Sequence, residues 1–145
     1  MRGKYIIFLL LALPTICGCR DGKREQGRAL LERIEAVDIK APYTKRKVSV
    51  AALEALELTD RELVRVRNLC LKAHQALIDT EERQAQARNS LDAVTQGDPK
   101  ASIPADRASA IAEALEDSNR ELRRAIEAFP YCEREVRSLA MRFNR

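Results

Sequence analysis

Apolar residues recur at intervals of three and four over most of this chain, which is the spacing of one face of an α-helix. In the two longest stretches the intervals alternate regularly, giving the seven-residue repeat of a coiled-coil seam. The seam positions are Leu63, Val66, Cys70, Ala73, Leu77, Thr80, Gln84, Ala87, Leu91 and Val94 in the first stretch, and Ala108, Ile111, Leu115, Ser118, Leu122, Ala125, Phe129, Cys132, Val136 and Leu139 in the second. The pattern therefore predicts two long helices that fold back on each other.

Local signals give the ends of the predicted helices. Thr59 and Glu62 have the spacing of a capping box, in which each satisfies a backbone donor of the other. Gly97 followed by proline is a stop signal, and Ser102 is a suitable cap for the last helix. Pro42 is expected to end the first helix, because the residue before a proline is disfavoured in the α conformation. The expected helices span about 23–41, 49–58, 60–96 and 103–145, with a basic connector at 43–47.

Two cysteines provide an independent check on this hairpin. When one long helix is reflected onto the other about the turn, Leu63 meets Leu139 and Cys70 meets Cys132. In an oxidising compartment such a matched pair predicts a disulfide. The alternatives are two buried thiols that never bond and a zinc site, although His74 has no second ligand at a suitable spacing. We predict an all-α fold, a small helical bundle built on a long antiparallel coiled-coil-like helical hairpin.

The first residues are typical of a secretory signal peptide, with two basic residues before a short apolar run from Tyr5 to Ile16. That run is too short to cross a membrane, which takes about 20 helical residues. The segment Ile16-Cys17-Gly18-Cys19 resembles the lipobox of bacterial lipoproteins, in which an aliphatic residue, a small residue and glycine precede the modified cysteine. Cys17 departs from the alanine or serine that is commoner there.

The resemblance implies that residues 1–18 are a removed signal peptide and that residues 19–145 are one mature domain. It further implies a diacylglycerol on the Cys19 thiol and an acyl chain on its amino group, which together anchor a protein durably. In enterobacterial lipoproteins an aspartate directly after the modified cysteine tends to retain the protein in the inner membrane. Arg20 stands at that position here, so the resemblance favours the periplasmic face of the outer membrane over the inner membrane. The alternative is an ordinary signal peptide that releases a periplasmic protein. No other cofactor is expected.

Charge is distributed unevenly along the predicted mature chain. Its 24 basic and 22 acidic residues leave a net charge of +2, too small to indicate nucleic-acid binding. Residues 79–120, the outer half of the hairpin, carry −4, and the rest carries +6. We expect the positively charged part of the molecule to lie near the membrane and the outer half of the hairpin to project from it as a two-helix arm. The basic residues expected to contact anionic lipid headgroups are Lys45, Arg46, Lys47, Arg142 and Arg145.

No catalytic or metal-binding arrangement is found in the sequence. There is one histidine, no glycine-rich phosphate loop, and no nucleophile with a base at a recognisable spacing. The acidic neighbours Glu81–Glu82 and Glu116–Asp117 point in different directions on a helix. We therefore expect a non-enzymatic envelope lipoprotein that binds an unidentified envelope protein as an assembly or accessory factor. The alternatives are a ligand- or cell-wall-binding lipoprotein and a mechanical spacer, and the oligomeric state stays open.

Overall fold

The computed structural model describes residues 19–95, 100 and 102–143, so the predicted signal peptide, with Cys17, and Arg145 lie outside the described residues. The described chain forms four helices and no strand, which confirms the predicted all-α fold and small helical bundle. The helices are α1 (Cys19–Glu35), α2 (Tyr43–Glu54), α3 (Arg61–Thr95) and α4 (Ala105–Phe143).

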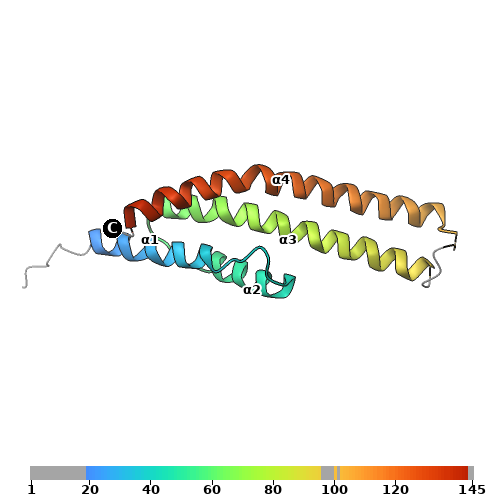
Figure 1. The fold of residues 1–145 in the computed structure, drawn as a ribbon, viewed down its shortest axis with the longest axis horizontal. Coiled ribbons are helices and arrows are strands. Elements are labelled where there is room, and N and C mark those ends of the chain that lie inside the picture. The colour runs from blue at the N-terminus through green and yellow to red at the C-terminus, as the bar shows by residue number, and fades with distance from the viewer. Residues whose placement is uncertain (1–18, 96–99, 101, 144–145) are drawn as a thin grey trace, which may run out of the picture.

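The helices run alternately up and down, and α3 lies between α4 and α2 (Figure 1). The longest interface joins α3 to α4, while α2 packs on α3 and α1 and does not contact α4. The start of α1 and the end of α4 meet at one end of the molecule, which we call the base. We call residues 83–95 of α3 and 105–117 of α4, which extend beyond α2, the arm.

The hydrophobic core lies in the base and draws on every helix. Leu30 of α1, Leu53 of α2, Leu63 of α3 and Leu139 of α4 are all completely buried in one cluster. Burying one such side chain contributes roughly 1.5–3 kcal/mol. The apolar stripes of the two short helices are thus covered only when both dock on the long pair, which makes the base a single unit.

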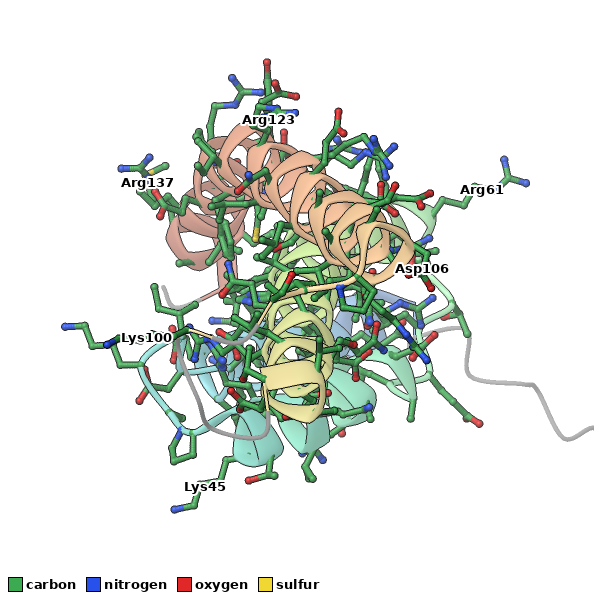
Figure 2. All side chains as sticks on the ribbon, turned by 90° about the vertical axis from the view of Figure 1, so that its right-hand side faces the viewer. Lys45, Arg61, Lys100, Asp106, Arg123 and Arg137 are labelled. Atoms are coloured by element: carbon green, nitrogen blue, oxygen red, sulfur yellow. A yellow bond between two sulfur atoms is a disulfide. The ribbon has the colours of Figure 1, made fainter. Side chains whose placement is uncertain are left out.

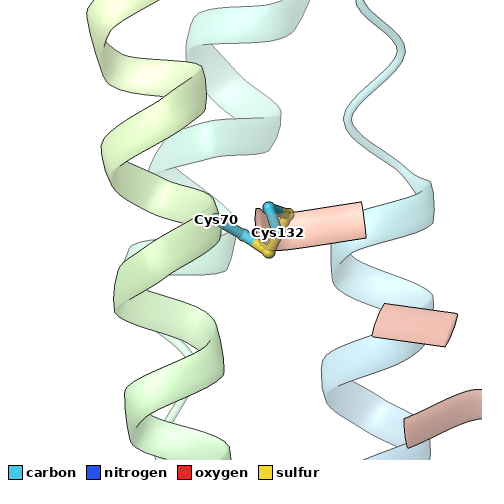
Figure 3. Close-up of a disulfide and its surroundings, with 2 residues drawn as sticks. All are labelled: Cys70 and Cys132. Carbon is cyan, nitrogen blue, oxygen red and sulfur yellow. A yellow bond between two sulfur atoms is a disulfide. The ribbon is translucent and has the colours of Figure 1, made fainter. Parts of the chain in front are cut away.

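Cys70 and Cys132 form the predicted disulfide, which joins α3 to α4 within this core (Figure 3). Their Cα atoms are 4.9 Å apart, and the two residues are separated by 62 positions in the sequence. Closing a loop of that length stabilises a fold by about 4 kcal/mol in the chain-entropy model. The alternatives of unbonded thiols and a zinc site are therefore not the arrangement of this structure.

The seam between the long helices closes only over part of their length. Ala87 and Ser118 are the last fully buried seam residues toward the tip, and beyond them Leu91 and Leu115 are 37% and 44% exposed. The buried hydroxyl of Ser118 donates to the Thr80 carbonyl at 3.2 Å. Thr80 therefore pairs with Ser118. The reflection of one helix onto the other places Thr80 opposite Leu122, which is one helical turn away from Ser118.

Pro130 bends α4 without breaking it, and α4 runs as one bowed helix from Ala105 to Phe143 (Figure 1). Proline has no N–H to donate to the carbonyl of Ile126, and its ring crowds the preceding turn. Residues 131–143 therefore continue the hairpin instead of forming a separate helix.

The predicted bounds of the two short helices are wrong. α1 ends at Glu35 rather than near residue 41, and α2 covers Tyr43–Glu54 rather than about 49–58, so the expected basic connector is helical. Pro42 has φ of −53° and stands directly before α2. Proline is favoured at a helix start because its missing N–H has no partner there in any case. It thus begins α2 instead of ending α1.

The start of α3 also differs from the predicted capping box. Asp60, not Thr59, caps the helix, because its carboxylate accepts the backbone N–H groups of Glu62 and Leu63 at 3.0 and 3.2 Å. The Thr59 hydroxyl and backbone N–H instead bond the side chain of Gln26 on α1. Thr59 thus forms hydrogen bonds with α1 instead of the local capping box with Glu62 that the sequence pattern predicts.

Candidate functional site

The junction where α2 meets α3 holds a buried ion pair. Arg46 is only 7% exposed, and its guanidinium contacts the Glu81 carboxylate and donates to the Ile39 carbonyl at 2.9 Å. The Nε atom of Arg46 is buried with no hydrogen-bond partner among the described residues. A buried guanidinium is costly unless it is paired. The start of α2 is therefore held on α3 by a charge contact as well as by apolar packing.

A second pair lies beside it on the surface. The Lys47 ammonium is 2.7 Å from the Glu82 carboxylate, which also accepts the Tyr43 hydroxyl. The hydrogen bond with Glu82 raises the pKa of Lys47, and the bond from Lys47 lowers the pKa of Glu82. Glu81 and Glu82, two of the acidic residues in the negative segment 79–120, are thus both paired with basic residues of α2. Of the predicted lipid-contacting residues, Arg46 is buried and Lys47 is paired.

The two other predicted residues that the structure describes, Lys45 and Arg142, are separated in space. Arg142 bonds Glu62 at 2.6 Å, and Lys23 bonds Glu62 and Asp60 at 3.1 and 3.0 Å, so one cluster ties α1, α3 and α4 together at the base. The hydrogen bond from Arg142 is the largest cause that lowers the pKa of Glu62. Lys45 is exposed at the start of α2 (Figure 2). The four of these residues that the structure describes do not form one surface.

His74 is buried between α3 and α4. Its ring packs edge-on against Phe129 with the centroids 5.0 Å apart. Burial lowers its pKa below the ordinary value of 6.5, and the charge of Arg46 lowers it further. The imidazole is therefore neutral at pH 7. This environment gives His74 a packing role.

An open hollow of about 650 Å³ lies where α2 begins. Its volume is in the range of ligand sites, roughly 300–1,000 Å³, and most of its lining residues have polar side chains. The lining residues are Tyr43, Glu81, Glu82, Gln84, Ala85, Gln86, Arg88 and Asn89. The hollow is not predictable from the sequence, because it exists only where α3 extends past the start of α2.

A further carboxylate, that of Asp117, is engaged in ion pairs. Asp117, at the root of the arm, contacts both Arg83 and Arg120. In the ranges 19–95 and 102–143, no three histidine, cysteine or acidic side chains are placed to hold a metal ion. None of the described helices has the length and apolar character needed to span a bilayer. No protein-family model, curated protein or solved structure matches this chain.

Proposed function

We propose that this protein is a lipid-anchored, non-enzymatic envelope factor that binds an α-helical segment of a partner protein on its arm. The observation that carries the proposal is the hollow beside the start of α2. There the side of α3 that receives α2 continues, and no other helix among residues 19–95 and 102–143 covers it.

The geometry of that side follows from helical spacing. α2 contacts α3 through Glu81 and Glu82, and Ala85 and Asn89 come three to eight positions later in the hollow. Residues three and four apart share one face of a helix, so Ala85 and Asn89 continue the row that begins at Glu82. A second helix laid end to end with α2 would therefore meet the same kind of surface.

The lining favours a helix over other occupants. Ala85 is small, which allows a close approach of a partner backbone, and polar side chains surround it, among them Gln86, Arg88 and Asn89. Amphipathic helices recognise such rows by anchors at i, i+3 and i+4.

The anchoring part of the proposal rests on the lipobox resemblance of residues 16–19. Cys19 begins α1 at the base, and the arm lies at the opposite end of α3. A helix of 35 residues is about 50 Å long at 1.5 Å per residue. The partner site is thus presented several nanometres from the anchored end, on the periplasmic face of the outer membrane.

Site-specific photo-crosslinking in living cells tests the partner site. A photoreactive amino acid at Ala85 or Asn89 is expected to give one common adduct, and the same group at the exposed Glu35 of α1 is the control. The substitution Ala85→Arg, which fills the hollow, should abolish the adduct formed from position 89 without changing the melting temperature. Equal adducts at all positions, or an adduct that survives Ala85→Arg, would contradict the proposal.

Anchoring is tested separately by intact-mass analysis and fractionation. The wild-type protein is expected in the membrane fraction with the mass of an acylated chain beginning at Cys19. The Cys19→Ser variant should lose the acyl mass and leave that fraction. An unmodified wild-type protein would remove the anchor from the proposal and leave the partner site to stand on its own test.

The volume of the hollow favours a second candidate, a small polar ligand such as a cell-wall fragment. Titration with soluble peptidoglycan fragments should then perturb the NMR signals of Tyr43 and Asn89, and Ala85→Arg should abolish the response. Unchanged spectra at millimolar fragment would exclude this candidate.

A further inference from the structure

The side of α4 that faces away from α3 carries an exposed row of basic and apolar residues. Their spacing of three and four places them in one stripe along the helix. Ile126 and Met141 in this stripe are 61% and 62% exposed. The outer stripe consists of Arg123, Ile126, Pro130, Arg134, Arg137 and Met141, all exposed. Figure 2 shows Arg123 and Arg137 projecting from α4, on the side of the molecule opposite Lys45.

The cations of the outer stripe are available for an external partner. Within the described residues, the structure records no ion pair for Arg123, Arg134 or Arg137. The Arg134 guanidinium lies 5.2 Å from the ring centre of Tyr131, which is itself 52% exposed. Two carboxylates, of Glu127 and Glu133, border the stripe, so arginines outnumber acidic groups there.

We propose that the outer stripe binds an anionic phospholipid surface and holds the long axis of the molecule along the membrane. Arginines interleaved with apolar side chains and a tyrosine are the composition of helices that lie in the bilayer interface. The aliphatic side chains enter the headgroup region, and the guanidinium groups pair with lipid phosphates. The charge of the stripe selects an anionic surface over a neutral one.

The stripe ends close to the proposed anchor. Gly27 of α1 packs against the ring of Phe143, and the Arg28 Nε donates to the Phe143 carbonyl at 3.2 Å, so the middle of α1 and the end of α4 are held together. A tether at Cys19 would raise the local concentration of the stripe at the lipid surface and make a weak contact effective. In this respect the inference rests on the proposed anchoring.

The same orientation exposes the proposed partner site. α2 and its hollow lie across α3 from α4, because α2 contacts α3 but not α4. With α4 against the lipid, the hollow faces away from the membrane, where a protein partner has access.

Tryptophan fluorescence tests the inference directly, because the chain contains no tryptophan. Full-length protein carrying Ile126→Trp is purified from membranes and reconstituted into phosphatidylcholine vesicles with or without phosphatidylglycerol. With phosphatidylglycerol, its emission should move to shorter wavelength and be quenched by brominated lipid. The control, Val48→Trp, places the probe at a 70% exposed position on α2 and should show neither effect.

Charge reversal identifies the cause of the contact. In the Ile126→Trp background, the triple variant R123E/R134E/R137E should lose the emission shift. Each cation near an anionic surface strengthens membrane binding by about fivefold, so the loss of three cations should weaken binding of the stripe by on the order of 100-fold. The control triple R33E/K45E/R61E changes the net charge equally at exposed positions away from the outer stripe and should keep the shift.

The outcomes separate the two proposals. Vesicle-bound protein whose probe at position 126 stays in water overturns the lipid contact while the anchor stands. Protein absent from the vesicles indicates a failed anchor, and the stripe is then tested by adding the same protein to anionic vesicles. Equal effects of the two triple variants, or an emission shift that requires added membrane proteins, also overturn the inference.

Discussion

The buried contact between Arg46 and Glu81 makes a quantitative prediction about how α2 is held. Glu81→Gln keeps the shape of the side chain and removes its charge. The Arg46 guanidinium is then left in the interior with two neutral acceptors, the new amide oxygen and the Ile39 carbonyl, and without a compensating negative charge. Its Nε already lacks a partner among the described residues, so no internal group can compensate.

The magnitude follows from the burial of each partner. Removing one member of a fully buried pair costs about 3–5 kcal/mol. The Glu81 side chain is 32% exposed, so water screens part of the charge, and we expect about 2 kcal/mol for Glu81→Gln. Arg46→Met leaves a carboxylate that can turn to solvent and should cost about 1 kcal/mol. The double variant should be destabilised by less than the sum, with a coupling energy of about 1–2 kcal/mol.

Urea unfolding followed by circular dichroism at 222 nm measures these values in the oxidised protein. The neighbouring Glu82→Gln is the matched control, because its partner Lys47 is 59% exposed and such surface pairs contribute about 0–1 kcal/mol. The reasoning is refuted if Glu81→Gln is no more destabilising than Glu82→Gln, or if the effects of the two single substitutions add.

Three further outcomes are expected. Replacing Cys70 and Cys132 together by alanine should lower the free energy of unfolding by about 4 kcal/mol in chemical denaturation, and a reductant should have no further effect on that variant. Gly27→Ala places a Cβ 2.5 Å from a ring carbon and should lower the melting temperature, with a cost of about 1–3 kcal/mol, whereas Gly22→Ala meets no atom within 4 Å and should stabilise α1 by up to about 1 kcal/mol. Because burial lowers the pKa of His74, stability should be complete above about pH 6.5 and fall as the pH decreases below it, where the unfolded chain binds the proton first. Pulse proteolysis across pH 5–7 should show that slope in the wild type and a flat profile in the His74→Gln variant.

The helical hairpin and its disulfide were predictable because both depend on regular spacing. A seven-residue repeat fixes which side of each long helix is buried, and the equal distances of Cys70 and Cys132 from the turn fix the register at one point. Complete burial of Leu63 and Leu139 in one cluster agrees with that register. These features need only helix geometry and one fold-back.

The short helices and the charge pairs were not predictable in the same way. The segment that begins at Tyr43 is rich in basic residues, so its apolar pattern is weak, and the proline before it is compatible with ending or starting a helix. The partner of Arg46 lies 35 positions away in the sequence. Only the folded arrangement of α2 on α3 shows that Glu81 and Glu82 are neutralised.

The arm shows a limit of the repeat itself. Leu91 and Leu115 occupy seam positions, yet both are more than one-third exposed. A heptad pattern indicates the apolar side of a helix but not how completely neighbouring helices cover it. In the base, α1 and α2 complete the packing, and in the arm no further described helix does so.

The disulfide also determines how this molecule transmits mechanical load. A tension applied between the start of α1 and the end of α4 crosses the Cys70–Cys132 bond, so the 61 residues between the two cysteines are not stretched. A force on the arm is instead shared by α3 and α4, the two segments that connect the arm to the disulfide. The disulfide keeps these two helices together at Cys70 and Cys132. A force on the arm therefore does not separate α4 from α3 at the disulfide.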